Sequence, residues 1–186
     1  MLNKIIAFFR TLFFGSPDTS RLPPVIPEPV VINGDSYPSF RLQSVDGVDG
    51  TTAEYELTKK AVQVLNKGCK LAKFKALVLQ AKFTETNGLT NQQIYNKLME
   101  HVNLVKVSFF NGSFRQNYIW KTVGLDVGDG VVYVNRHFVT NEKALASLIL
   151  HETCHKLGFS HLIKGGKYTS IPYTCNRIIE EVMNGL

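Results

Sequence analysis

The chain has little cysteine, and its cysteines do not form a disulfide framework. It contains only Cys69, Cys154 and Cys175 in 186 residues, and no two of them form a CxxC pair. An odd number of cysteines without such a pair excludes a small domain held together by several disulfides. We expect buried free thiols, and a single bridge between Cys154 and Cys175 is the alternative.

Internal repeats and long uncharged apolar runs are also missing. The N-terminal apolar stretch is too short and too charged to span a bilayer. Apolar residues make up 44% of the chain and charged residues 19%, which is ordinary for a globular protein and excludes wholesale disorder. The length fits one domain with an additional segment.

Acidic residues are fewer than basic ones, which gives a net charge of +6. A positive charge favours an anionic partner, such as a nucleic acid, a lipid surface or an acidic substrate. Part of the excess lies in a lysine-rich segment, for which we expect a solvated helix face. No stacking aromatic residues or glycine-rich RNA motif accompany these lysines, so nucleic-acid binding is not expected. The lysines are Lys59, Lys60, Lys67, Lys70, Lys73, Lys75 and Lys82.

Residues 1–15 have the pattern of an amphipathic helix with a cationic polar face. We expect this helix to lie on an anionic membrane surface. A secretion signal and a helix packed on the domain are the alternatives. A peripheral membrane or secreted location is therefore favoured over the free cytosol. The apolar stripe consists of Leu2, Ile5, Ile6, Phe9, Leu12 and Phe13.

Residues 16–40 are interpreted as a proline-rich linker, because six of the seven prolines lie between Pro17 and Pro38. Proline lacks the amide donor and fixes φ, which favours an extended chain. The remaining residues, 41–186, are then the folded domain.

The periodicity of apolar residues in this domain predicts that helices come first. Residues 51–83 have a helical pattern, with a break at Gly68. Thr90 and Gln93 match a capping box, which predicts a helix that runs from this point to about Met99.

A small sheet and one further helix follow in the predicted order. Alternating apolar residues predict strands at 103–110, 117–127 and 131–138, with a turn at 128–130. The further helix starts after Thr140 or Asn141 and runs to Leu157. Helices, a small sheet and a last helix together indicate an α+β fold.

This last helix carries the sequence HETCHKLGFSH at 151–161, which holds three of the chain's five histidines. His151 and His155 are four residues apart, so their rings lie on one face of the helix and can bind one metal ion. Zinc binds imidazole nitrogen and acidifies a bound water, from which Glu152 can take a proton. The pattern thus provides two zinc ligands and a general base.

A third ligand requires the chain to turn back after the helix. Gly158 can end the helix in the left-handed conformation because it has no Cβ. His161 can then reach the same ion, and a fourth coordination position stays open, as is typical of a catalytic zinc site. The other two histidines, His101 and His137, have no such neighbours, and a surface position is expected for them.

The segment resembles the HExxHxxGxxH signature of the metzincin zinc metalloproteases at every fixed position. The resemblance covers residues 131–178. It implies a small zincin-like domain with N-terminal helices, a twisted sheet and a zinc-binding active-site helix. It also implies Zn²⁺ as cofactor, Glu152 as catalytic base and a protein or peptide as substrate. We expect the chain to be a monomer.

The resemblance further implies that the strand before the active-site helix is an open sheet edge. An extended peptide substrate would pair with this edge through its main chain. The residues of the expected substrate-binding edge are Val131, Val132, Tyr133, Val134 and Asn135.

The sequence departs from the metzincin pattern downstream of the motif. Metzincins have a turn with a methionine beneath the zinc, whereas the only methionine after the motif here is Met183, in an expected terminal helix. Pro172 suits a tight turn within 169–178. Some metzincins place a tyrosine after that methionine to bind zinc or the oxyanion, and the candidate catalytic residue is Tyr173, with Tyr168 second. A tyrosine that only packs in the turn is the alternative.

The same residues have two other interpretations as a site. In the gluzincin arrangement, Glu180 or Glu181 would be the third ligand, but Gly158 and His161 would then have no role. Histidines satisfied by hydrogen bonds alone would need no metal. The alternative functions are a membrane-docked binding module with a degenerate or structural zinc site, and a zinc hydrolase of another amide, such as a cell-wall crosslink.

Sedimentation with anionic liposomes tests the role of residues 1–15. Deleting them should abolish the binding of the chain to these vesicles, because the apolar stripe and the cationic face are removed together. Unchanged binding of the shortened chain would show that this segment is not a membrane-surface helix.

Overall fold

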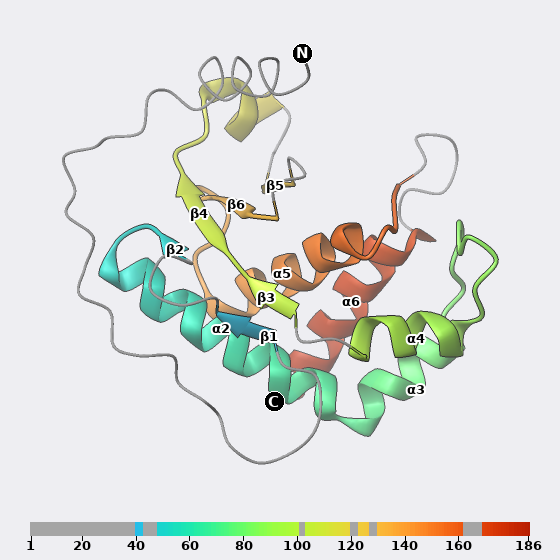
Figure 1. Cartoon of the computed structure of the whole chain (residues 1–186). Helices are drawn as coiled ribbons and strands as arrows, with labels where there is room; N and C mark the ends of the chain where they lie inside the picture. Colours follow the sequence, from blue (N-terminus) through green and yellow to red (C-terminus); the bar gives the residue numbers. More distant parts are fainter. Residues whose placement is uncertain (1–39, 43–47, 101–102, 120–122, 127–129, 162–168) are drawn as a thin grey trace.

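The computed structural model of the chain describes residues 40–42, 48–100, 103–119, 123–126, 130–161 and 169–186 (Figure 1). The predicted terminal helix at 1–15 and nearly all of the linker at 16–40 lie outside the described residues. So do His101, Tyr168 and most of the predicted turn at 128–130. The described part is a mixed α+β fold, which confirms the predicted class.

Three of the described helices, α2, α4 and α5, begin at a residue whose side chain caps the helix. Thr51 with Glu54, and Thr90 with Gln93, form capping boxes, and the second of these was predicted from the sequence. Within the described residues, no helix is both long and apolar enough to cross a bilayer. The helices are α2 (Thr52–Lys70), α3 (Ala72–Gln80), α4 (Asn91–Met99), α5 (Glu142–Lys156) and α6 (Ile171–Met183).

Gly68 does not break a helix, contrary to the prediction. Helix α2 continues through it, and the break comes at Leu71, whose backbone is extended. A Cβ at position 68 would lie 2.8 Å from Cδ1 of Ile179 on α6. The glycine is therefore explained by the close packing of α2 against α6, a constraint that is not visible in the local sequence.

The described strands form two small sheets. β1 (Phe40–Leu42) pairs in parallel with β3 (Asn103–Val105). In the second sheet, neighbouring strands are parallel except for the last two, which are antiparallel. In order across this sheet, its strands are β2 (Val48–Asp49), β4 (Val107–Phe110), β6 (Val132–Asn135) and β5 (Gly124–Asp126).

The predicted strand at 103–110 is present as β3 and β4, which are separated only by Lys106. Val105, Val107 and Phe109 are buried, while the residues between them are more exposed. This is the alternation expected of a strand with one face on the core. The period-2 pattern therefore identified this strand correctly.

The predicted strand at 117–127 is wrong in its first part. A single π-helical turn, η2 (Arg115–Ile119), precedes β5. The Nδ2 group of Asn117 donates to the carbonyl of Gly112 at 2.9 Å, and its Oδ1 accepts from the Asn135 amide at 2.8 Å. Such side-chain hydrogen bonds compete with a strand ladder, which accounts for the turn.

β6 is not an open edge of the sheet. It pairs with β4 on one side and with β5 on the other, and all four of its residues are buried. The predicted substrate-binding edge, which comprised Val131, Val132, Tyr133, Val134 and Asn135, is therefore wrong. Alternation indicates which residues form a strand, but strand order depends on pairing between segments that are distant in the sequence.

Helix α5 is enclosed by other elements of the fold, with contacts to α6, α2 and β5 (Figure 1). Residues 145–150 are all buried, so the helix is enclosed rather than amphipathic. Gly124 lets β5 approach it closely, because a Cβ there would lie 2.7 Å from Cδ1 of Leu148. The segment that leads into His151 is thus held between a strand and two helices.

An ion pair fixes the sheet to the start of α2. Arg136, directly after β6, places Nε 2.5 Å and Nη2 3.2 Å from the carboxylate oxygens of Glu54. Burial raises the pKa of Glu54, but hydrogen bonds from Arg136 and Thr51 outweigh it and leave the pKa below its ordinary value. The carboxylate therefore stabilises the fold at neutral pH, and this contribution is lost as the pH falls through its folded-state pKa.

Candidate metal centre

The first two histidines of the motif lie on one face of α5, near its C-terminal end. The helix is capped by Asn141 rather than by Thr140, because the Asn141 side chain accepts from a backbone N–H of the first turn at 2.9 Å. It runs without interruption to Lys156. His151 and His155 are therefore one helical turn apart, and both are half-buried.

The helix ends at a left-handed residue, as the sequence predicts. Gly158 has a φ of +88°. Its N–H donates to the carbonyl of His155 at 2.9 Å, and the N–H of Phe159 donates to the carbonyl of Cys154 at 3.0 Å. These two bonds form a Schellman motif. Phe159 is buried and anchors the chain after the bend, which returns His161 to the side of α5.

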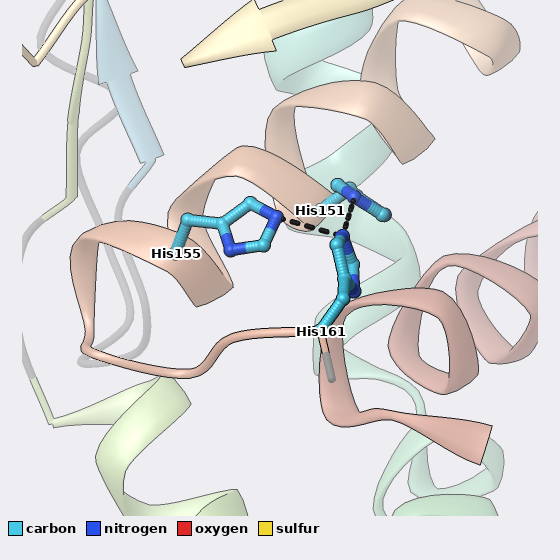
Figure 2. Close-up of side chains that lie close together, drawn as sticks. All are labelled: His151, His155 and His161. Carbon is cyan, nitrogen blue, oxygen red and sulfur yellow. Dashed lines mark hydrogen bonds between the residues drawn. The ribbon is translucent and has the colours of Figure 1, made fainter. Parts of the chain in front are cut away.

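The three imidazole rings converge on one point, with His161 reaching in from outside the helix (Figure 2). Its Nε2 lies 3.2 Å from Nε2 of His151 and 3.0 Å from Nε2 of His155. Two nitrogen ligands at roughly 2.0–2.1 Å from a tetrahedral zinc ion are about 3.3 Å apart. The histidines therefore lie close enough to bind a metal ion, and they are the only such group among the described residues.

Hydrogen bonds at the outer ring nitrogens orient two of the rings. Nδ1 of His155 lies 2.8 Å from the carbonyl oxygen of Phe159. Because a carbonyl only accepts, this Nδ1 donates, and in the neutral ring Nε2 then presents its lone pair to the cluster. Nδ1 of His161 lies 3.0 Å from Oγ of Ser170. Partners of this kind hold metal-binding histidines in the required tautomer and orientation.

The two residues predicted to be catalytic lie on α5 and α6. Tyr173, in the first turn of α6, has its ring centroid 4.5 Å from that of His161 and 4.9 Å from that of His151. Its ring therefore packs against two of the three imidazoles. Glu152 follows His151 in α5 and is only 5% exposed, so its carboxylate is shielded from bulk water.

Neither glutamate of the gluzincin alternative belongs to the cluster. Glu180 accepts hydrogen bonds from the Ser147 hydroxyl at 3.0 Å and from the Asn176 amide at 2.9 Å. Glu181 is exposed and pairs with Lys73 at 2.9 Å. The convergent group contains histidines only, so the geometry favours a histidine as the third ligand.

The segment after the motif differs from its prediction. Pro172 lies in the first turn of α6 rather than in a tight turn, because a helix does not need the N–H of its first residues. Met183 lies at the other end of the same helix and faces Gly68 of α2. It is about 15 Å from Tyr173 along the helix axis. Met183 is therefore not beneath the histidines.

The three cysteines are free and buried, so the alternative bridge is not present. Burial raises the pKa of the Cys69 thiol. Burial and a hydrogen bond with Cys175 raise the pKa of the Cys154 thiol. Because the thiolate is the form that binds metal, the raised pKa values of Cys69 and Cys154 disfavour metal binding by these two thiols. All three cysteines are buried core residues, on α2, α5 and α6.

Ser170 and the carbonyl of Phe159 are site groups that the sequence prediction did not include. A serine just before Ile-Pro is typical of a helix start, and this signal could have placed Ser170 at the cap of α6. Nothing in the sequence links it to His161. His137 is exposed, as predicted.

Comparisons of the chain with protein-family models, curated proteins and solved structures gave no match. Its function is therefore argued from the chemistry of the site.

Replacing His161 should weaken zinc binding by more than about 100-fold, because the loss of a ligand's hydrogen-bond partner alone weakens binding 10–100-fold. The measurement is competition between His161→Ala and a chromophoric chelator. His137→Ala is the matched control and should bind zinc like the wild type. A double variant, Glu180→Ala with Glu181→Ala, that loses more affinity than His161→Ala would assign the third ligand to a glutamate.

Replacing Gly158 tests the bend. A Cβ at this position would meet nothing within 4 Å, so Gly158→Ala should act only through its positive φ, at about 1–2 kcal/mol. Zinc binding then has to restore the bend at this cost, so the affinity of the variant for zinc should fall by about tenfold. Gly88→Ala is the matched control, since Gly88 has a φ of +80° and equally open surroundings. Equal zinc affinity in the two variants would contradict the role of the bend.

Proposed function

We propose that the chain is a zinc-dependent peptidase of metzincin type. Its metal ligands would be His151, His155 and His161, and Glu152 would be the general base. The observation that carries this proposal is the convergence of three imidazole Nε2 atoms around one point, at separations of 3.0 and 3.2 Å from His161. We also propose that residues 41–186 form a zincin-like domain.

The donor set fits zinc. Neutral imidazole nitrogens are among its preferred ligands, and harder ions such as magnesium and calcium prefer oxygen. Facing lone-pair nitrogens at this spacing repel one another unless a proton or a cation lies between them. Three protein ligands also leave a fourth position for water or substrate, which supports a catalytic site over a structural one.

In the proposed reaction, the metal ion and the side chains of the protein have different roles. Bound zinc supplies a Lewis acid that acidifies water and polarises a carbonyl. Glu152 takes the proton from the attacking water and delivers it to the amine as the peptide bond breaks.

Tyr173 has two proposed roles at this site. Its ring packs on His161 and His151 and so limits how far these rings can rotate. Its hydroxyl could donate a hydrogen bond to the oxyanion that forms as the carbonyl is attacked. Tyr173→Phe separates the two roles, because it removes the hydroxyl and keeps the ring.

β5 is the proposed pairing edge for an extended peptide. It ends the strand order of the described sheet and is antiparallel to β6. Its Gly124 packs against Leu148, one helical turn before His151. A peptide that adds to β5 would therefore run close to the ligand-bearing end of α5, held by main-chain hydrogen bonds.

Glu152→Gln should reduce peptide hydrolysis by at least about 100-fold, because the amide cannot accept the proton. Zinc content should not change, since residue 152 is not a ligand. The assay is digestion of a denatured protein mixture with zinc supplied, with and without a chelator. Glu142→Gln, the same substitution in the first turn of the same helix, should retain activity.

The same assay separates the alternatives. A zinc-loaded wild type that cleaves no peptide contradicts the peptidase proposal. Zinc binding without hydrolysis of any amide would favour the binding module, and release of products from a cell-wall crosslink would favour the other amide hydrolase.

A further inference from the structure

Ser170 occupies the N-cap position of α6, but its side chain does not cap the helix. It directly precedes α6 and is fully buried. Serine is favoured at this position because its oxygen accepts from an N–H of the first turn. Thr51, Thr90 and Asn141 make this bond at the starts of α2, α4 and α5. The side chain of Ser170 makes no such bond to α6.

The hydroxyl of Ser170 is directed to a histidine instead. Its Oγ lies 3.0 Å from Nδ1 of His161, nine residues earlier in the chain. The first turn of α6 thus lacks a side-chain cap, and the serine contacts the third histidine of the cluster.

The backbone around Ser170 is held from two sides. Its carbonyl accepts from the N–H of Thr174 in α6 at 2.9 Å. On the other side it forms a parallel bridge with Thr84, whose N–H donates to the carbonyl of Thr169 at 2.9 Å. The backbone that carries the hydroxyl is therefore held by α6 and by the segment after α3.

His161 needs such a partner more than the other two histidines do. His151 and His155 project from a buried helix, whereas His161 lies in neither a helix nor a strand. Gly158 returns the chain to the cluster but does not set the rotation of the ring. A bond from Nδ1–H to the serine oxygen would set it and leave the lone pair of Nε2 facing the other rings.

We propose that Ser170 is a positioning residue for His161, and that it sets the affinity of the site for a divalent transition metal. This inference rests on the metal site of the proposed function but not on peptide hydrolysis. It predicts that Ser170 acts on metal binding and has little effect on the stability of the metal-free fold.

Ser170→Ala tests the proposal. Zinc affinity, measured by chelator competition, should fall 10–100-fold, while the metal-free melting temperature should stay close to that of the wild type. Thr90→Ala, which removes a working cap, should do the opposite and lower the melting temperature without changing zinc affinity. A Ser170→Ala variant that loses stability but keeps its zinc affinity would overturn the proposal.

A double-mutant cycle provides the second measurement. Ser170→Ala should have no further effect on zinc affinity once His161→Ala is present, because the hydroxyl acts only through that ring. Additive losses would overturn the proposal. The absorption spectrum of bound Co²⁺ should also change in Ser170→Ala and return in Ser170→Thr, which keeps the hydroxyl.

These outcomes separate the two proposals. A wild type that binds zinc but cleaves no peptide refutes the peptidase and leaves the role of Ser170 standing. A wild type that binds zinc, with Ser170→Ala binding equally well, refutes only the role of Ser170. A wild type that binds neither Zn²⁺ nor Co²⁺ refutes both.

Discussion

The candidate site depends on the reversal of the chain at Gly158. A helix can place two histidines on one face, but it carries every later residue away from them by about 1.5 Å per position. The left-handed backbone of Gly158, closed by two hydrogen bonds to the end of α5, returns the chain instead. Without this bend, His151 and His155 would be a pair of half-buried histidines. With it, a third imidazole joins them, and the three rings lie close enough to bind one metal ion.

Around that bend, the fold supplies rigidity in two different ways. The first two histidines stand on a helix whose preceding residues, 145–150, are buried on all sides. The third has no secondary structure of its own, and its ring is held by contacts: Ser170 at its outer nitrogen and the face of Tyr173. Both contacts come from the start of α6, one from its N-cap residue and one from its first turn. The start of α6 therefore matters to the site although α6 supplies no ligand among the described residues. Metal sites commonly depend on such outer partners.

The sequence predicts the parts of this arrangement that are local. Helical spacing places His151 and His155, and the lack of a Cβ at Gly158 predicts the turn that brings His161 back. The parts that depend on contact between distant segments could not be predicted. The order of the strands, which makes β5 rather than β6 the end of the described sheet, is set by long-range pairing. Gly68 is small because α6 crosses it, and Ser170 meets His161 only in the folded chain.

X-ray absorption at the zinc edge of the zinc-loaded protein, combined with elemental analysis, tests the central claim most directly. The account predicts one zinc per chain, bound by three imidazole nitrogens at roughly 2.0–2.1 Å and by one oxygen ligand in the fourth position. A protein that retains no zinc, or a spectrum with two imidazoles or with sulfur ligands, would contradict it.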